Sequence, residues 1–496
     1  MLNYNDVRKR ALNNCRNYKS KNYPHFDKTL SKGQIAKLLS KFNNPRFVKS
    51  YRHLPFICFN ITFNKYKKVS DHHKGLCPKE RPISLPSHHD ALLLKYYSEI
   101  LSICYEEYVN DHNMENLAIA YRKNRSNITG AKEVFDTIWK NENCWIIKGD
   151  FEHFFDNLNH KVLFKNVRKV LNKFIGNKLP EDWISVLSFL TKYRKINKNQ
   201  LDKIKNCFKN GHYLNNLSIL GKYINDHTLN ISKKNSVGIP QGTAISAVSA
   251  NVYMIGFDKN VQNILQKYQG SYRRYSDDFA IIIPTRNCSF YEMCTIKNKI
   301  IKLSEDKLSL KIKNEKTEVL SFCKEQHRLL DCYNNREKSF DYLGFSFNGK
   351  SVFLRPKTIY KFHYRGKHAI HLLVRNMKER RIAKVPSDNS YKALKIRYLD
   401  SKRFFRKEKV SKRLDKIREE YKKGIGLRGR RKTTIMYLLN KPINKKNMLS
   451  YAYRSQKLLS AKIPECSDLY NVCIKKKVVK EIGTFQQEFG CLRKKS

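Results

Sequence analysis

Residues 271–283 have the sequence SYRRYSDDFAIII, in which two adjacent carboxylates, Asp277 and Asp278, stand between a Tyr-containing segment and a run of apolar β-formers. This pattern predicts a β-hairpin with the two acids at its tip. Adjacent side chains on a strand point to opposite faces, so only a bend lets both carboxylates approach one site. Buried acids this close are costly unless a positive charge lies between them, and a divalent metal ion commonly supplies it.

A third carboxylate follows a second β-rich run. Residues 144–156 have the sequence CWIIKGDFEHFFD, an apolar segment that ends at Asp150 and continues through a turn into aromatic residues. A strand here could place Asp150 beside Asp277, and the backbone carbonyl of Phe151 could complete an oxygen-only shell, which suits Mg²⁺. A solvated turn before a core strand is the alternative, and it holds if the three acids do not meet.

The composition points to a nucleic acid as partner. The chain has 496 residues, enough for two to four packed units, and 100 Lys and Arg residues against 43 acids give a net charge of +57. A charge of this size favours binding to phosphate backbones through counterion release. An anionic membrane surface is the alternative partner, but no basic amphipathic helix or lipidation signal favours it.

The cysteines and the apolar runs predict an intracellular, soluble protein. The thirteen cysteines include no Cys-x-x-Cys pair, which is typical of reduced thiols in a cytosolic chain. The first residues, MLNYND, contain no apolar signal region, and no apolar run reaches the roughly 18 residues that a membrane span requires.

These segments resemble a known family. Residues 150–156 are similar to motif A of reverse transcriptases, and Tyr275 to Asp278 are similar to motif C; further blocks follow in the family's order from about Lys79 to about Phe347. The resemblance implies an α+β right-hand polymerase with fingers, an RRM-like antiparallel palm sheet and a helical thumb or C-terminal module. The implied division is a helical extension at 1–75, fingers at 76–145, a palm at 146–350 and a basic helical module at 351–496.

The resemblance also implies a catalytic set. Asp150, Asp277 and Asp278, with the Phe151 carbonyl, would hold two Mg²⁺ ions (Mn²⁺ is possible), about 3.5–4 Å apart, that activate a 3′-hydroxyl and stabilise the leaving pyrophosphate. Lys316 matches the motif D lysine, a candidate general acid for the pyrophosphate. Phe155 matches the steric gate that would favour deoxynucleotides. A surface lysine and a core phenylalanine are the alternatives, and the sequence leaves open which of Phe154 and Phe155 faces the site. Asp156 is expected to cap or hydrogen-bond the following helix rather than to bind metal.

Other blocks supply the nucleotide contacts. Prolines keep the segment with Lys79 and Arg81 extended, so that both cations can be presented to a triphosphate, and Arg122 is similar to a second fingers arginine. A solvated edge strand and a surface loop are the alternatives. The segment VGIPQGTAIS at 237–246 resembles motif B, in which Gln241 and Gly242 line the base-pair pocket. Ala247 stands where many members have proline, which argues against a typical group II intron enzyme.

The C-terminal part and the biological setting depend most on the resemblance. Beyond about residue 355, helical spacing and basic runs replace strand signals, and GIGLRG at 424–429 is interpreted as a flexible linker because no βαβ unit surrounds it. The hairpin pattern FDYLGFSFNGK at 340–350 looks like the primer grip of abortive-infection and other phage-defence enzymes. This implies a bacterial, cytoplasmic DNA polymerase, RNA-directed or untemplated and possibly protein-primed, in antiviral defence.

The expected partners are dNTPs, a structured noncoding RNA and the DNA product, with a possible homo-oligomer and no membrane. Three other functions stay open. The first is a retron- or intron-type mobile-element reverse transcriptase, and the second is a catalytically idle RNA-binding assembly protein. The third is an RNA-dependent RNA polymerase, which Phe155 and Tyr275 disfavour because both favour dNTPs.

Overall fold

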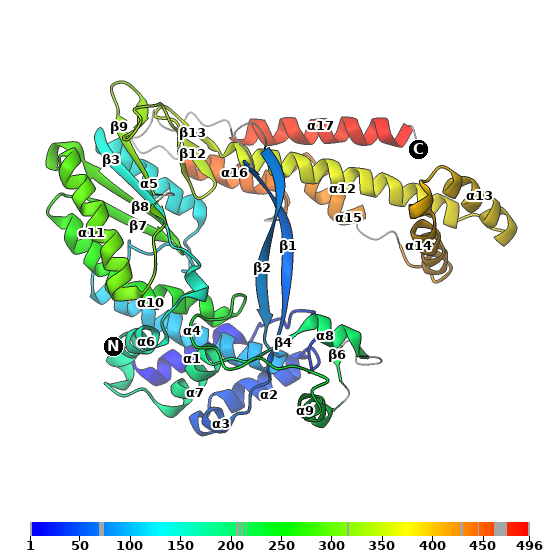
Figure 1. The fold of residues 1–496 in the computed structure, drawn as a ribbon, viewed down its shortest axis with the longest axis horizontal. Coiled ribbons are helices and arrows are strands. Elements are labelled where there is room, and N and C mark those ends of the chain that lie inside the picture. The colour runs from blue at the N-terminus through cyan, green and yellow to red at the C-terminus, as the bar shows by residue number, and fades with distance from the viewer. Residues whose placement is uncertain are drawn as a thin grey trace. The chain divides into compact units, whose positions relative to one another are not determined.

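The computed structural model describes residues 2–68, 74–204, 208–209, 212–214, 216–314, 317–426, 430–444, 446–460 and 474–494 (Figure 1). The chain forms two compact units. The first contains Met1–Gly130, Asn143–Ser321 and Asp331–Asn335, and the second contains Ala131–Glu142, Phe322–Leu330 and Arg336–Ser496. The mixture of helices and mostly antiparallel sheets is the predicted α+β fold.

The central sheet of the first unit confirms both predicted strands and the hairpin. Four strands of this five-stranded sheet follow the order β9-β3-β8-β7, with β3 at Asn143–Asp150, β7 at Ser271–Tyr275, β8 at Asp278–Pro284 and β9 at Glu318–Cys323. The β3–β8 and β7–β8 pairs are antiparallel. Strand β8 is buried from Phe279 to Pro284, as expected for a continuous apolar run in the middle of a sheet.

Helices bury the sheet and build the rest of the first unit. Apolar residues of α10 (Ala244–Gln266) and α11 (Phe290–Leu308) belong to the same core cluster as Ile281 and Ile283. The other elements of this unit are α1 (Tyr4–Cys15), α2 (Lys32–Phe42), α3 (Pro45–Ser50), α4 (His88–Asp111), η1 (Phe154–Asp156), α6 (His160–Ile175), α7 (Glu181–Thr191), β4 (Lys195–Asn197), α8 (Lys198–Lys203), β5 (Phe208–Lys209), β6 (His212–Tyr213), α9 (Leu217–Asn225) and η2 (Thr285–Asn287).

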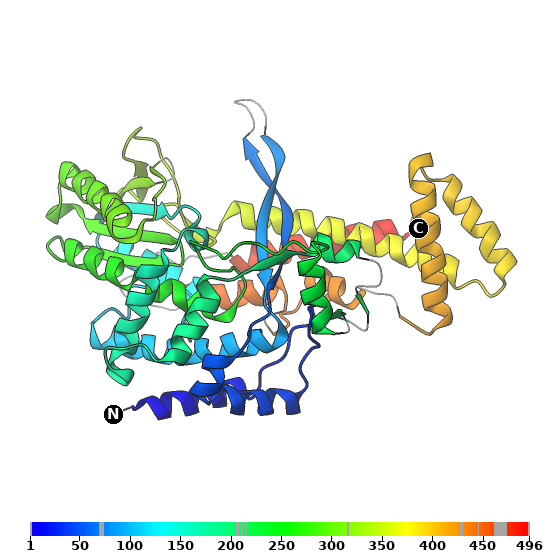
Figure 2. The same ribbon diagram turned by 60° about the horizontal axis from the view of Figure 1, so that its bottom comes forward.

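A long two-stranded arm, β1 (Phe56–Lys68) and β2 (Lys74–Leu85), also belongs to the first unit (Figures 1 and 2). The strands pair antiparallel, with Arg81 opposite Ile61, and β1 also pairs with β4. Strand β2 is therefore an edge strand, which explains how it tolerates Pro78 and Pro82: proline lacks the N–H that a central strand must donate.

The second unit combines a small sheet with long basic helices. Strands β11 (Phe340–Tyr342), β12 (Phe345–Phe347) and β13 (Val352–Leu354) pair in that order, and Leu343 and Gly344 make the first turn with positive φ values of 48° and 93°. This confirms the hairpin predicted at 340–350. The other elements are α5 (Asn127–Lys140), β10 (Arg328–Asp331), α12 (Pro356–Ala383), α13 (Asp388–Asp400), α14 (Phe404–Lys422), α15 (Arg430–Thr433), η4 (Thr434–Leu438), α16 (Met448–Leu459) and α17 (Ile474–Lys494).

Helices α12 and α17 pack closely. A Cβ at Gly366 would lie 2.2 Å from the Phe485 ring, so glycine is required there, and His363 Nδ1 is 2.7 Å from Glu481 Oε2. No described helix of the chain is long and apolar enough to cross a membrane.

A buried histidine anchors the base of the β1–β2 arm. The Nδ1 atom of His25 accepts from the Phe26 N–H at 2.9 Å, and its Nε2–H donates to the Leu85 carbonyl at 3.2 Å, at the end of β2. Both bonds belong to the neutral imidazole, and burial lowers the pKa of His25 from 6.5 to about 4.

Acidification should therefore destabilise the first unit. Below pH 6.5 the unfolded imidazole binds a proton that the folded one takes up only near pH 4, so the free energy of unfolding falls as the pH drops through this window. Between pH 7 and pH 5 we expect a loss of about 2 kcal/mol from His25. Urea unfolding at both pH values, compared with the His25→Gln variant, measures it, and an equal pH dependence in the variant would contradict the assignment.

Candidate active site

The structure brings the three predicted acids to one end of the central sheet. Asp150 and Asp278 are directly opposite in the β3–β8 ladder, a pairing that holds Cβ atoms about 4.5–5.5 Å apart on one face. Asp277 lies in the turn next to them, and its carbonyl accepts from the Phe151 N–H at 3.2 Å. Two strand ends and one tight turn thus bring Asp150 close to Asp277 and Asp278, although 127 residues separate Asp150 from Asp277 in the chain.

The turn that carries Asp277 has only two residues. Tyr275 pairs with Asp278, so Ser276 and Asp277 form the loop, and Ser276 has a φ of 61°. A serine in this left-handed region is strained, and the strain persists only where neighbours over-determine the conformation. Two contacts do so: the Ser276 hydroxyl is 3.0 Å from the Tyr121 hydroxyl, and its carbonyl accepts from Arg274 at 3.0 Å.

Arg274 connects this turn to helix α10 through a fully buried ion pair. Its Nε and Nη2 atoms donate to the two oxygens of Asp258 at 2.9 and 2.7 Å, and the side chains are 0% and 1% exposed. Tyr272 donates to the same carboxylate at 2.9 Å. Burial disfavours the cation, but Asp258 outweighs it and raises the pKa of Arg274. The sequence analysis missed this pair, although a lone acid in the apolar part of α10 was a signal for it.

Gly149 leaves room for an aromatic ring behind the acids. It lies opposite Phe279 in the ladder, and a Cβ at Gly149 would meet that ring at 2.2 Å. The ring has no space to withdraw, because it is buried against Phe151 and Tyr272. The glycine before Asp150 therefore fixes how closely β3 and its neighbour pack at the site.

The two phenylalanines that follow the turn have different environments. Phe154 is buried at 3% exposure and packs against Phe151, whereas Phe155 is partly exposed. Phe154 therefore belongs to the core, and Phe155, which lies at the edge of the core, is the ring that is more accessible from solvent.

The predicted base-pair loop contacts both the arm and the segment after Asp150. The Gln241 carbonyl accepts from the Ser84 N–H at 3.4 Å, which joins the loop to the end of β2, and Gly242 has a φ of 112°. Gly238 packs even more tightly, since a Cβ there would lie 2.4 Å from the Asp156 carbonyl oxygen.

Asp156 has a different partner from the one predicted. We expected it to cap or hydrogen-bond the following helix. Asn159 is the N-cap of α6, and the Asp156 carboxylate instead accepts from Gln241 Nε2 at 3.4 Å.

The basic candidates separate into two groups. Lys79 and Arg81 lie two residues apart on β2, hence on one face of it, and both are exposed. Arg122 is committed elsewhere: its Nε and Nη2 atoms bond both oxygens of Glu106 at 2.8 and 2.6 Å, its Nη1 bonds the Ala118 carbonyl at 2.9 Å, and its side chain is 5% exposed. This arrangement favours a structural role for Arg122 over the predicted nucleotide contact.

Lys316 lies outside the described residues, but a neighbouring lysine reaches the site. The Lys313 N–H donates to the Asp150 carbonyl at 3.4 Å, and its ammonium is 2.7 Å from Glu152 Oε1. The hydrogen bond from Lys313 lowers the pKa of Glu152. The sequence analysis overlooked Lys313, because the chain has so many lysines that only its backbone pairing distinguishes it.

The donor atoms at the site suit a hard cation. Carboxylate and carbonyl oxygens are the ligands that Mg²⁺ and Mn²⁺ take, and the end of β3 and the Asp277–Asp278 turn can supply both. Among the described residues, however, no three His, Cys, Asp or Glu side chains already converge as a metal-binding group. The backbone pairing brings the segments of the three acids together, and the assignment of their carboxylates to a metal ion stays a prediction.

Comparison with known proteins identifies the fold of this site. A family model described as reverse transcriptase (RNA-dependent DNA polymerase) matches residues 66–347, more than half of the chain. No curated protein matches the sequence.

Among solved structures, apo telomerase from Candida tropicalis truncated from its C-terminal domain matches at 11% identity and a TM-score of 0.37, over 60% of this chain and 57% of that one. The longer apo telomerase from Candida tropicalis matches at 12% and 0.36, over 60% and 48%. Telomerase from Candida albicans with a fragment of telomeric RNA matches at 13% and 0.36, over 90% and 67%. The chain thus spans about half the length of the first two.

Breaking the buried pair should cost far more than breaking a surface pair. The Asp258→Asn variant leaves the Arg274 cation without a carboxylate, and we expect the free energy of unfolding to fall by about 3–5 kcal/mol. Glu181→Gln, which removes the exposed partner of Lys49, should cost less than about 1 kcal/mol. Urea unfolding measures both, and equal losses would show that the buried pair is not a structural anchor.

Proposed function

Because the chain belongs to the reverse transcriptase (RNA-dependent DNA polymerase) family, we propose that it extends DNA by adding dNTPs opposite an RNA template. The observation that supports this most directly is the pairing of Asp150 with Asp278, which sets the acids of two strand ends side by side next to Asp277. Family membership alone does not identify a catalytic centre, and the closeness of these three residues supports this assignment.

We assign Asp150, Asp277 and Asp278, with the Phe151 carbonyl, as the ligands of two Mg²⁺ ions, which Mn²⁺ can replace. Bound there, the metal ions would activate the 3′-hydroxyl and neutralise the leaving pyrophosphate. The protein's own contribution is to hold the carboxylates at fixed strand ends, since the ladder and the Arg274–Ser276 bond leave the acid turn little freedom. We assign Lys316 as the cation that protonates the pyrophosphate.

The nucleotide contacts follow from the arm and the loop. Lys79 and Arg81 share one exposed face of β2, where they can hold a triphosphate. The same strand ends at the hydrogen bond to Gln241, so the phosphate contacts and the base-pair loop are parts of one connected surface. Gly242, which has no side chain, lets the nascent base pair approach the backbone closely.

The biological setting is a finer proposal. We propose that a structured noncoding RNA accompanies the enzyme and that the enzyme serves bacterial antiviral defence. The support is the Tyr342-Leu343-Gly344-Phe345 hairpin and the net charge of +57, which favours a large nucleic-acid partner. A retron- or intron-type enzyme is the second candidate, and a branched RNA–DNA product would favour the retron type.

Removing two of the acids should abolish synthesis without abolishing binding. For Asp277→Asn with Asp278→Asn we expect Mg²⁺-dependent dNTP incorporation to fall at least about 1,000-fold, because both metal ions lose ligands. RNA binding should persist. Asp306→Asn, an exposed acid on α11, is the matched control and should retain activity. Incorporation that survives in the double variant would overturn the metal assignment.

Phe155 should control the choice of sugar. In Phe155→Ala we expect the ratio of ribonucleotide to deoxynucleotide incorporation to rise roughly 10–200-fold, because the 2′-hydroxyl no longer meets a ring. Phe154→Ala is the control: it empties a core position, so it should lower stability by about 3–5 kcal/mol and leave the ratio unchanged. An altered ratio in Phe154→Ala alone would assign the gate to the other ring.

A further inference from the structure

Helix α6 has an exposed face that carries basic residues and no acid. Its apolar residues Leu163, Val167, Val170 and Leu171 are buried in the main core cluster, together with Phe151. The opposite face is basic and exposed, and the exposed cations along the helix and the turn after it are Lys161, Lys165, Arg168, Lys169, Lys173 and Lys178. No Asp or Glu occurs between residues 157 and 180, so the segment itself cannot neutralise them.

The acids on the elements next to α6 form ion pairs with other residues and leave most of the α6 cations without a partner. Asp111 and Glu107 of α4 face Lys173 alone, at 2.7 and 3.6 Å. Glu181 at the start of α7 pairs with Lys49. Asp182 is buried.

The Asp182 carboxylate accepts a hydrogen bond from the Tyr97 hydroxyl at 2.6 Å and lies 3.5 Å from the Arg8 guanidinium. Asp182 therefore does not neutralise the exposed cations of α6. Within the described part of the chain, Lys161, Lys165, Arg168 and Lys169 have no ion-pair partner. Four unpaired cations on one helix face repel one another, and a polyanion bound along that face would relieve the repulsion.

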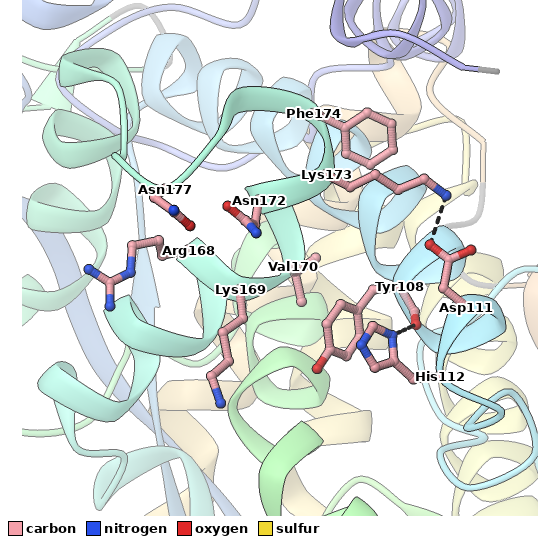
Figure 3. A pocket seen from close by; sticks show the side chains of 10 residues that line it. All are labelled: Tyr108, Asp111, His112, Arg168, Lys169, Val170, Asn172, Lys173, Phe174 and Asn177. Carbon is pink, nitrogen blue, oxygen red and sulfur yellow. Dashed lines mark hydrogen bonds and ion pairs between the residues drawn. The ribbon is translucent and has the colours of Figure 1, made fainter.

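The surface beside these cations is hollowed. A hollow of about 690 Å³ lies between the end of α4 and α6, and Arg168, Lys169 and Lys173 line it (Figure 3). A second hollow of about 580 Å³ lies beside Lys161 and Lys165. The two share Arg168 and Asn177, so they form one groove along the helix, which we call the α6 groove.

One end of the α6 groove presents an aromatic pair. The rings of Tyr108 and His112 stack at 4.0 Å with an interplanar angle of 19°, and His112 Nδ1 bonds the Tyr108 carbonyl at 2.8 Å (Figure 3). Flat rings beside cations are the combination that accepts an unpaired base next to a phosphate chain. A membrane surface fits less well, because interfacial binding requires an exposed apolar face beside the cations, and the apolar face of α6 is in the core.

We propose that the α6 groove binds the phosphate backbone of folded RNA at a place separate from the polymerase site. From Lys161 to Lys169, the span of the unpaired cations, the helix rises about 12 Å, the length of roughly three to four phosphate steps along one strand of a duplex. The bound RNA contributes its backbone and one unpaired base at the Tyr108 end. This site goes beyond the proposed catalysis, since it holds RNA without acting on it.

The test replaces the unpaired cations. In the groove variant, Lys165→Glu, Arg168→Glu and Lys169→Glu reverse three exposed charges. In the control variant, Lys299→Glu, Lys302→Glu and Lys307→Glu make the same change of net charge on exposed positions of α11. The probe is a fluorescein-labelled RNA hairpin with a stem of about 16 base pairs and an unpaired loop. Its affinity is measured over a series of salt concentrations with the full chain.

We expect the groove variant to bind the RNA hairpin more than about tenfold more weakly than the unchanged protein. The slope of log association constant against log salt concentration should fall in magnitude by about 2.7, as the loss of three phosphate contacts requires. The control should keep the slope. Equal losses in both variants would show an effect of net charge alone and would overturn the proposal, as would no loss in the groove variant. If the glutamates prevent folding, as thermal unfolding would show, the corresponding glutamine variant is measured under the same criteria.

Two further arms separate this site from its alternatives. Incorporation on a pre-annealed template and primer should be unchanged in the groove variant, so a failure of the polymerase proposal leaves this binding test intact. Vesicles of phosphatidylserine and phosphatidylcholine provide the other arm, and groove-dependent binding to them without binding to the hairpin would overturn the assignment to RNA.

Discussion

The buried bond between Arg274 and Asp258 is the constraint on which the site depends. It fastens β7, which leads into the acid turn, to α10, which follows the base-pair loop, and the same guanidinium holds the strained Ser276 carbonyl. An ion pair in the core costs desolvation and is kept only when both partners are fully hydrogen-bonded, as they are here. The ion pair fixes the position of β7 relative to α10, and both elements lie next to the acids.

Most of the fold could be predicted from local pattern. The apolar run of β8 and the one that ends at Asp150 specify buried strands, and the Asp-Asp turn specifies the hairpin between β7 and β8. The pairing of Asp150 with Asp278 could be expected only by analogy with a family, because no local signal encodes a contact over 128 residues. The helical character after residue 355 was also visible in the periodicity, although the packing of Gly366 against Phe485 was not.

The misjudged residues share a cause. The role of Arg122 depends on Glu106 and that of Asp156 depends on Gln241, which are partners set by tertiary structure rather than by spacing. Lys313 and the α6 cations were overlooked for a different reason, which is the number of similar residues in the chain. In a chain with 100 basic residues, single lysines carry little information until burial and pairing show which of them lack a counter-charge.

The closeness of Gly238 to Asp156 has a mechanical consequence. A backbone separation that excludes even a methyl group leaves the segment after Asp150 and the loop before α10 unable to slide past each other. The segment after Asp150 and the loop before α10 must therefore move together, as one rigid body, when the enzyme binds and releases substrate. The Ser84 N–H donates to the Gln241 carbonyl at 3.4 Å, so this body is also joined to the end of β2, where His25 anchors the arm.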